Sequence, residues 1–258
     1  MDEAYERKYH SLEDQHWWFK SRRDILLRLL KTANKNSHIL EVGCSGGLLL
    51  QDLKSKGFQN VYGIDVSGQT INISRSKGLQ NVLLMNAVET GFPDECFDII
   101  LASDVLEHLQ HDGVALSEWN RLLKPGGLLI IFVPAFSFLW SNHDASNHHY
   151  RRYTKAELIC ALQRAHFQIE RCSYWNFTLF FPKSLGNLFG RLISRTNDYS
   201  ADRFFQHQPS PMVNRFLSSL IRSENMILRM FNLPIGVSVF ALSTKTTRSL
   251  STPDWRNI

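Results

Sequence analysis

The 258-residue sequence lacks a cysteine pattern that would indicate disulfide bonds or a structural zinc site. Its few cysteines are scattered, with no Cys-x-x-Cys pair: Cys44, Cys96, Cys160 and Cys172. This spacing fits a reducing compartment. The first six residues are acidic and lack the apolar core of a signal peptide, so we expect a cytoplasmic protein.

The sequence also lacks a hydrophobic run long enough to span a bilayer, which needs about 20 residues. The longest apolar stretch, Leu128 to Trp140, is interrupted by Pro134. The hydrophobic content of 43% is typical of globular proteins, so the sequence predicts one large domain with a substantial core. We place this domain at residues 1–245 and expect a flexible, Ser/Thr-rich tail at 246–258.

Positive charge is present but not clustered. The formal net charge is +5, and the basic residues are dispersed, without a Lys/Arg-rich arm or a recognisable nucleic-acid-reading motif. We therefore expect no DNA partner and retain RNA only as an alternative supported by charge.

A glycine-rich turn between two predicted strands is the most informative feature that is present. Ile39 to Val42 reads as a buried strand, Gly43 and Gly47 permit a sharp turn, and Leu48 begins a helix whose N-terminus faces a ligand. Asp65 ends the next strand, where its carboxylate can accept hydrogen bonds from both hydroxyls of a ribose. The pattern predicts an open α/β sheet that binds an adenosine-containing cofactor.

The turn does not match the Gly-x-Gly-x-x-Gly motif of dinucleotide sites. From Gly43 it reads Gly-Cys-Ser-Gly-Gly-Leu, which fails at the third and sixth places. Glu41, two residues earlier, would repel a pyrophosphate but suits a ligand with an ammonium group. S-adenosyl-L-methionine contains adenosine and an amino-acid end without phosphate, so we predict it as the cofactor.

Residues from about Ile39 to Val133 resemble the core of the class I S-adenosylmethionine-dependent methyltransferases of the small-molecule type. Ser45 replaces the usual middle glycine of the first motif, and Asn86 stands where the family often has an aspartate. The resemblance implies a Rossmann-like, seven-stranded, mostly parallel sheet with helices on both faces and an antiparallel last strand. It implies these cofactor-binding residues: Glu41, Gly43, Cys44, Ser45, Gly47, Asp65, Val66, Asn86, Ala87, Ser103 and Asp104.

The chain divides into five consecutive parts within the predicted domain. We expect an N-terminal helical lid at 1–35, a cofactor-binding half at 36–135, an acceptor-side loop, helix and strand at 136–175, a helical insertion at 176–234 and the last strand at 235–244. Thr154 with Glu157 three residues later predicts a capping box at the start of the acceptor-side helix.

Two polar clusters follow the fourth and fifth predicted strands. In the first, Asp104 and His108 would share a face if a helical turn began at Asp104. Related quinone-pathway O-methyltransferases carry a similar acidic-acidic-histidine group that can hold a divalent metal, here Asp104, Glu107 and His108. We favour the simpler interpretation, in which Asp104 caps the helix and contacts the cofactor, and expect no metal. His108 is then a candidate general base.

The second cluster is His143-Asp144 followed by a His-Tyr-Arg-Arg-Tyr-Thr segment from His149. A subset of bacterial methyltransferases has a similar pattern, together with an aromatic-basic N-terminal segment. His143 and His149 are further candidate bases, because histidine titrates near neutrality. The two arginines could clamp an anionic group of the acceptor. The predicted acceptor-side residues are Trp18, Arg22, Tyr150, Arg151 and Arg152.

The insertion contains an apolar-basic stretch at 177–195, which could form an amphipathic helix on an anionic membrane or a helical cap packed on the core. Taken together, the sequence predicts methyl transfer to a small-molecule or lipid- or glycan-linked acceptor, most simply at oxygen. Two alternatives stay open: a non-catalytic methyltransferase-like binding subunit and an RNA methyltransferase.

Overall fold

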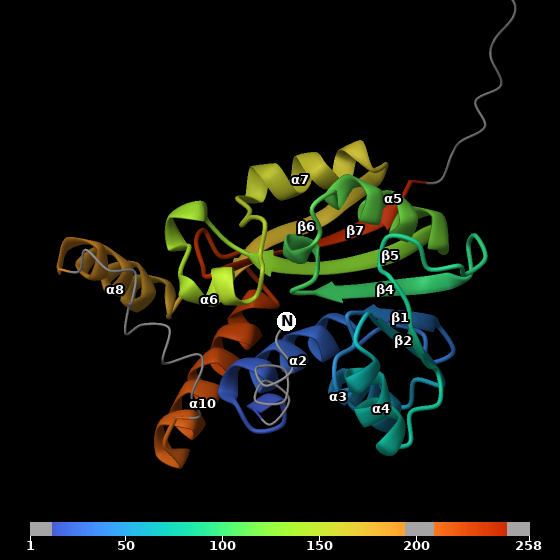
Figure 1. Ribbon diagram of the computed structural model, residues 1–258, viewed down its shortest axis with the longest axis horizontal. Helices are drawn as coiled ribbons and strands as arrows, with labels where there is room; N and C mark the ends of the chain where they lie inside the picture. The colour runs from blue at the N-terminus through green and yellow to red at the C-terminus, as the bar shows by residue number, and fades with distance from the viewer. Residues whose placement is uncertain (1–11, 194–208, 247–258) are drawn as a thin grey trace, which may run out of the picture.

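A single mixed sheet forms the centre of the computed structural model, which describes residues 12–193 and 209–246 (Figure 1). The strand order is β3-β2-β1-β4-β5-β7-β6. β7 runs antiparallel to both its neighbours, and the remaining pairs are parallel. The strands are β1 His38–Val42, β2 Asn60–Asp65, β3 Val82–Leu84, β4 Phe97–Ser103, β5 Leu123–Pro134, β6 Phe167–Trp175 and β7 Ser238–Lys245. The predicted fold class is confirmed.

Helices cover both faces of the sheet (Figure 1). One face carries α2 (Trp17–Leu29), α3 (Leu48–Ser55) and α4 (Gly68–Ser76), and the other carries α5 (Asp112–Leu122) and α7 (Lys155–Arg164). Each face has its own hydrophobic cluster, so the strands between them are buried on both sides, as in other α/β sheets. Fully buried side chains include Ile25, Leu50, Phe132, Trp119, Leu158 and Leu162.

The predicted capping box at α7 is present. The Glu157 backbone N–H donates to Thr154 Oγ1 at 3.2 Å, and the Thr154 N–H donates to the Glu157 carboxylate at 2.7 Å. These bonds satisfy backbone donors that have no partner within the helix. The described residues also form three shorter helical elements: η1 (Leu106–His108), η2 (Ser137–Leu139) and α6 (Asn142–Ser146).

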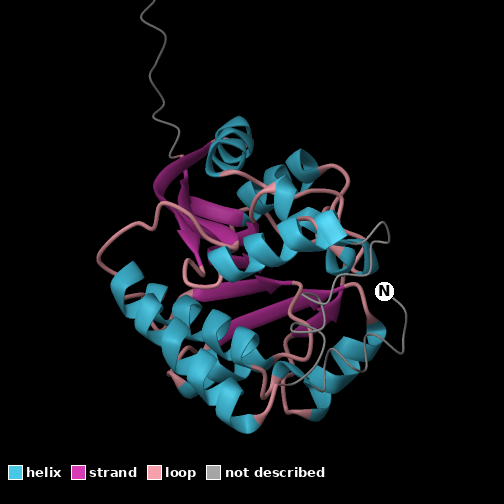
Figure 2. Cartoon of the chain, turned by 90° about the vertical axis from the view of Figure 1, so that its left-hand side faces the viewer, coloured by secondary structure: helices cyan, strands magenta, loops and turns pink. Residues whose placement is uncertain are grey.

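A helical insertion separates β6 from β7, as predicted, and supplies α8 (Phe180–Ile193) and α10 (Pro211–Leu228) at one end of the molecule (Figures 1 and 2). α10 packs against α2 through buried polar groups as well as apolar ones. Asn225 accepts a hydrogen bond from Trp175 Nε1 at 2.8 Å and donates to the Ser21 carbonyl at 3.0 Å. Among the described helices, none combines the length and hydrophobicity needed to cross a bilayer.

Three predicted features fall partly or wholly outside the described residues: the start of the N-terminal lid (1–11), the middle of the insertion (194–208) and the tail from 247 onward.

Candidate active site

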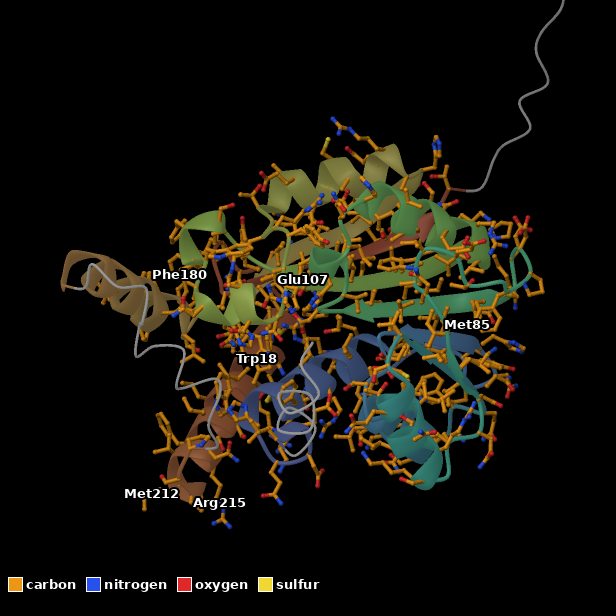
Figure 3. All side chains as sticks on the ribbon, viewed as in Figure 1. Trp18, Met85, Glu107, Phe180, Met212 and Arg215 are labelled. Carbon is orange, nitrogen blue, oxygen red and sulfur yellow. The ribbon has the colours of Figure 1, made fainter. Side chains whose placement is uncertain are left out.

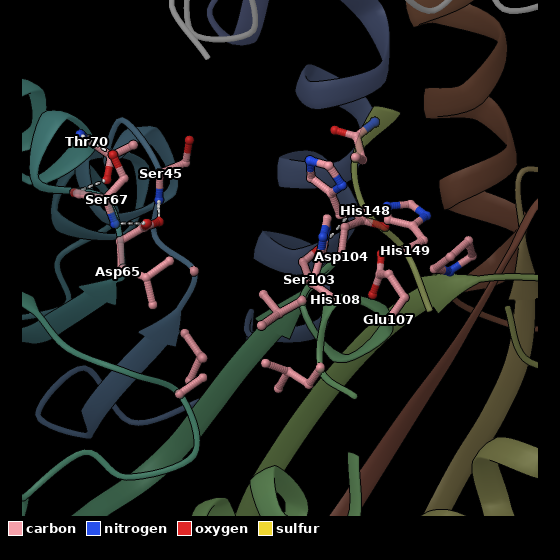
Figure 4. A pocket seen from close by; sticks show the side chains of 18 of the residues that line it. Ser45, Asp65, Ser67, Thr70, Ser103, Asp104, Glu107, His108, His148 and His149 are labelled. Atoms are coloured by element: carbon pink, nitrogen blue, oxygen red, sulfur yellow. Dashed lines mark hydrogen bonds between the residues drawn. The ribbon is translucent and has the colours of Figure 1, made fainter. Parts of the chain in front are cut away.

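A cavity of about 720 Å³ opens at the carboxyl ends of β1, β2, β4 and β5. This is the edge at which ligands bind in open α/β sheets, and the volume suits a drug-sized molecule. Figure 4 shows two groups of side chains facing each other across it: Asp65, Ser67 and Thr70 on one side, and Glu107, His108 and His149 on the other. The cavity therefore has room for two chemically different partners.

Asp65 is held rigidly at the end of β2. Its two carboxylate oxygens accept hydrogen bonds from the backbone N–H groups of Ser45 and Ser67, both at 3.0 Å. Ser67 also caps α4, because its Oγ accepts from the Thr70 N–H at 3.4 Å. Each Asp65 oxygen retains further acceptor capacity toward the cavity. The carboxylate that we predict to bind the ribose is thus fixed in position by the backbone.

Glycine is required at both predicted positions of the turn after β1. Gly43 has φ +69°, and a Cβ there would lie 2.6 Å from Val105 Cγ2. Gly47 has φ +74°, and its Cβ would lie 2.3 Å from Leu79 Cδ1. Gly43 lines the cavity, whereas Gly47 does not. Gly47 therefore serves the close packing beneath the turn, and its predicted contact with the cofactor stays a prediction.

Ser45 adopts the left-handed conformation that its family position usually reserves for glycine, with φ +46°. Such a conformation costs a non-glycine residue about 1–3 kcal/mol unless its surroundings impose it. Here the Ser45 backbone N–H is bonded to Asp65, and its Oγ donates to Glu13 Oε1 at 2.5 Å. The serine therefore preserves the turn and links it to the segment before α2.

Glu41 is buried beneath the turn and lines a smaller adjoining cavity together with Cys44. Burial raises the pKa of the Glu41 carboxyl well above its usual range, and the negative charges of Glu13 and Asp65 add to the effect. Its Oε2 has no hydrogen-bond partner among the described residues. A buried acidic oxygen without a partner is costly, and a cation placed beside it would offset that cost.

The remaining predicted cofactor residues line the main cavity from three strand ends. Asn86 uses its amide oxygen to accept a hydrogen bond from the Val88 N–H at 3.1 Å, which leaves its NH₂ group and one lone pair for a ligand. Val66 is largely exposed and Ala87 is buried, and both provide apolar surface beside Asp65. Ser103 lies at the end of β4.

Asp104 does not cap a helix, contrary to our expectation. It has φ +56°, and only a single 3₁₀ turn follows, beginning at Leu106, so Asp104 and His108 do not share a helical face. Its carboxylate instead accepts from Arg22 Nη2 at 3.3 Å, and the Ser103 hydroxyl also donates to it. Arg22 is buried and lines the smaller cavity, so it lies nearer the cofactor turn than the predicted acceptor side.

A buried ion-pair network organises the second polar cluster. Asp144 is fully buried and accepts from Arg152 Nε and Nη2, both at 2.8 Å, and from His149 Nδ1 at 2.9 Å. These partners hold the pKa of Asp144 far below its usual range. The carboxylate is therefore an acceptor only, which assigns the His149 proton to Nδ1 and leaves Nε2 as the ring's acceptor.

The arginine pair already has partners within the chain. Arg152 forms an ion pair with Asp144. Arg151 forms an ion pair with Asp112 at 3.0 Å and donates a hydrogen bond to the Gln110 carbonyl. Arg151 does not line the cavity, whereas Tyr150, Arg152 and Trp18 do. Both arginines therefore have acidic partners within the chain, and a clamp on an acceptor anion stays a prediction.

The other two candidate bases, His108 and His143, also line the cavity. Burial lowers the pKa of His108 to about 4 and that of His143 to about 3, so both rings are neutral at pH 7. The rings of His108 and His149 meet edge to face, with centroids 4.5 Å apart. Each is close enough to influence the electrostatic environment of the other.

Glu107 lies beside these rings (Figure 4), and its side chain is fully buried. Burial raises the pKa of its carboxyl, and neither of its oxygens has a hydrogen-bond partner among the described residues. One potential ligand atom each from Glu107, His108 and His149 lies within 4.8 Å of the others, a spacing that could hold a metal ion. The metal-binding triplet considered from the sequence was Asp104, Glu107 and His108. In the structure, His149 takes the place of Asp104 in this group.

Comparison with known proteins agrees with this geometry. A family model described as a methyltransferase domain matches residues 40–131. Residues 40–131 belong to the class I S-adenosylmethionine-dependent methyltransferases. A "Probable S-adenosylmethionine-dependent methyltransferase" of Mycolicibacterium smegmatis is 27% identical over 168 residues, covering 64% of this chain and 65% of the relative. A Xanthomonas oryzae ubiquinone biosynthesis O-methyltransferase is 30% identical over 160 residues, covering 53% and 65%.

The chain thus spans slightly less than two thirds of the length of these methyltransferase relatives. Solved structures share the fold along most of the chain. A chain from the complex of the Haloferax volcanii Trm112 methyltransferase activator with a methyltransferase has a TM-score of 0.62, 18% identity and 95% coverage of both chains. A methyltransferase from Archaeoglobus fulgidus has a TM-score of 0.58, 19% identity and coverage of 92% and 99%.

The cofactor of this methyltransferase family is S-adenosyl-L-methionine, and the residues present fit it. Asp65 offers fixed carboxylate oxygens for the ribose, and the unpartnered Glu41 oxygen suits the ammonium group of the amino-acid end. The glycine turn between them leaves space that a Cβ at Gly43 would take. No pyrophosphate-binding arrangement is needed at this methyltransferase turn.

Several residues that line the cavity were not among the predicted site residues. Lys183 of α8, His148 and Asn147 all line the acceptor side. His148 lies within the histidine-rich segment, so the sequence pattern could have indicated it as a site residue. No sequence pattern indicated Lys183, because the insertion reaches the cavity only through the tertiary packing of α8.

Proposed function

We propose that this chain transfers a methyl group from S-adenosylmethionine to a hydroxyl oxygen of a small-molecule or lipid- or glycan-linked acceptor. The observation that carries the proposal is the His149–Asp144 pair, which places an oriented imidazole on the cavity wall opposite Asp65. The O-methyltransferase names of distant relatives in ubiquinone biosynthesis support the same chemistry.

S-adenosylmethionine, when bound, supplies a methyl group already activated by the positive sulfur. The chain's main task is therefore to position two reactants, which contributes up to about 7–11 kcal/mol in well-oriented systems. Asp65 would hold the ribose end, and Glu41 would hold the amino-acid end. Trp18 lines the cavity from α2 and excludes water from its side of the site.

An acceptor hydroxyl must lose its proton as the new carbon–oxygen bond forms. We assign this proton to Nε2 of His149, because Nδ1 is already protonated and bonded to Asp144. The buried Asp144 carboxylate stabilises the imidazolium that results, and Arg152 keeps the carboxylate in place. Burial lowers the pKa of His108 and His143, so each of these rings is a weaker base than an ordinary histidine.

Radiolabelled transfer from S-adenosylmethionine into bacterial lipid and small-molecule extracts tests the proposal. We expect incorporation by the wild type, and a 10²–10⁴-fold lower rate for His149→Gln and Asp144→Asn at unchanged cofactor affinity. His166→Asn is the matched control, because His166 is exposed and its φ of +61° is one that asparagine accepts. Equal rates for His149→Gln and the control would contradict the assigned base, and cofactor binding without transfer would favour a binding subunit.

A further inference from the structure

α10 presents a large apolar surface on the side that faces away from the core. Its buried side chains Leu217, Ile221 and Leu228 lie against the rest of the protein. The opposite side exposes seven large apolar side chains in and just after the helix, with these exposed fractions: Met212 82%, Met230 76%, Phe216 64%, Phe231 63%, Met226 60%, Ile227 54% and Val213 39%. Single exposed apolar residues are ordinary, but a contiguous set on one helix marks an interaction surface.

A row of arginines borders this apolar surface. Arg215, Arg222 and Arg229 are spaced seven residues apart, so they fall on one line along the helix, because seven residues complete almost two full turns. All three are exposed, and no described residue forms an ion pair with them. Figure 3 shows Met212 and Arg215 projecting from the same end of α10, away from the body of the protein.

Negative charge is absent from the exposed surface of α10. Glu224, its sole acidic residue, is buried and accepts hydrogen bonds from the backbone N–H groups of Phe177 and Thr178 at 2.9 and 3.0 Å. The helix therefore combines an apolar strip with an adjacent line of uncompensated cations. This combination suits a surface that is apolar inside and anionic at its edge.

We propose that α10 docks the protein on an anionic lipid bilayer. Phe216 and Met230 enter the boundary between headgroups and acyl chains, and the arginine row contacts lipid phosphates. A second copy of this chain fits less well, because a self-complementary contact would bring two arginine rows close together. A nucleic acid would pair with the arginines but leave the apolar strip exposed to water.

This assignment moves the membrane contact from residues 177–195 to α10. In α8, Lys183 turns into the active-site cavity, whereas Phe181 and Leu185 are exposed. The side chains from 187 to 193 and residues 194 and 195 lie outside the described part of the chain. α10 is also tied to α2, since the Trp17 N–H donates to Asn214 Oδ1 at 2.9 Å.

The contact between α10 and α2 connects the proposed docking face, the exposed apolar and arginine side of α10, to the cavity. Trp18 of α2 lines that cavity. If the proposed function holds, a docked protein would meet acceptors dissolved in the membrane. The docking itself is independent of methyl transfer, so its test uses vesicle binding and the two ideas can fail separately.

Co-sedimentation of the full chain with two kinds of vesicle tests the docking face. We expect binding to phosphatidylcholine vesicles that contain phosphatidylglycerol, and much weaker binding to phosphatidylcholine alone. Arg215→Gln with Arg222→Gln and Arg229→Gln should weaken binding on the order of a hundredfold, since each arginine near the surface contributes about fivefold. Phe216→Ser with Met230→Ser should also release the protein, even at low salt.

The matched control removes three exposed positive charges elsewhere: Lys54→Gln, Lys56→Gln and Arg164→Gln. It should retain binding to anionic vesicles, and all variants should keep the circular dichroism spectrum and cofactor affinity of the wild type. Equal loss in the control would reduce the effect to net charge and overturn the proposal. Absence of vesicle binding would also overturn the proposal. A dimer that the Phe216 and Met230 changes dissociate would then assign this surface to a second copy of the chain, and RNA binding that needs the three arginines would assign it to RNA.

Discussion

The guanidinium carbon of Arg22 lies 4.2 Å from the centre of the Trp175 ring. It also lies 4.4 Å from the Phe132 ring, while its Nη2 donates to Asp104 and to Ser238 Oγ. A planar cation can stack on aromatic rings and donate in its own plane at the same time, which an ammonium group cannot do. Arg22 thereby joins α2 to the strands that carry the cavity.

Arg22→Ala should lower the free energy of unfolding by about 3 kcal/mol, because it removes the stacking and leaves Asp104 without its cation. Arg22→Lys should recover only part of this loss. Arg28→Ala on the same helix is the control, since its i,i+4 pair with Asp24 is partly exposed and should contribute less than about 1 kcal/mol. Urea unfolding measures all three, and equal effects at the two arginines would contradict the role given to Arg22.

Gly43→Ala should weaken S-adenosylmethionine binding at least about tenfold, because the new methyl group would meet Val105 at the cavity wall. Gly78→Ala is the control, because it introduces the same backbone strain without the steric clash. Gly78 also has a left-handed φ, +84°, but a Cβ there meets nothing within 4 Å. Calorimetric titration should show normal affinity for Gly78→Ala, and similar losses in both variants would point to general strain.

The contributions of His108 and His143 to stability should fall as the pH is lowered from about 6.5 toward 4, while the raised pKa values of Glu41 and Glu107 act in the opposite direction. His108 and His143 have native pKa values of about 4 and about 3, below the ordinary value of 6.5, because burial disfavours the charged rings. In this window the unfolded chain binds protons that the native state does not. Each ring thus contributes up to about 1.4 kcal/mol per pH unit. As the pH is lowered across this window, the urea midpoint of His108→Asn should rise relative to that of the wild type; an unchanged slope would contradict this account.

Chelation should leave methyl transfer unchanged. The methyl group of the cofactor is already activated by the positive sulfur, so its transfer needs no metal ion as a Lewis acid. Activity after dialysis against EDTA, with metal content measured in parallel, checks this. Loss of activity that one divalent ion restores would instead assign Glu107, His108 and His149 as its ligands.

Local sequence patterns were sufficient for the cofactor half. The strand from Ile39, the glycines after it and Asp65 lie close together in the chain, so their order and spacing indicate the strand, the turn and the acid that follows. The capping box at Thr154 is equally local. These features depend on neighbouring residues, which a sequence displays directly.

The acceptor side depends on distant contacts, and there the predictions diverged. Asp104 does not cap a helix, because only a 3₁₀ turn follows it, and its carboxylate accepts from Arg22 of a helix far earlier in the chain. The predicted arginine clamp did not anticipate that Arg152 pairs with Asp144 inside the protein. Lys183 reaches the cavity from α8. In each case the deciding partner lies in another element, and spacing along the chain does not reveal it.

The insertion that contains α8 and α10 leaves the sheet at Trp175 and returns at Ser238, and these two residues are paired in register. Its ends are therefore already neighbours, and the sheet closes in the same way whatever lies between them. The segment can diverge or be exchanged as a cassette while the glycine turn and Asp65 stay unchanged. Evolution could in this way redirect one methylating scaffold to new acceptors or new surfaces without rebuilding its cofactor site.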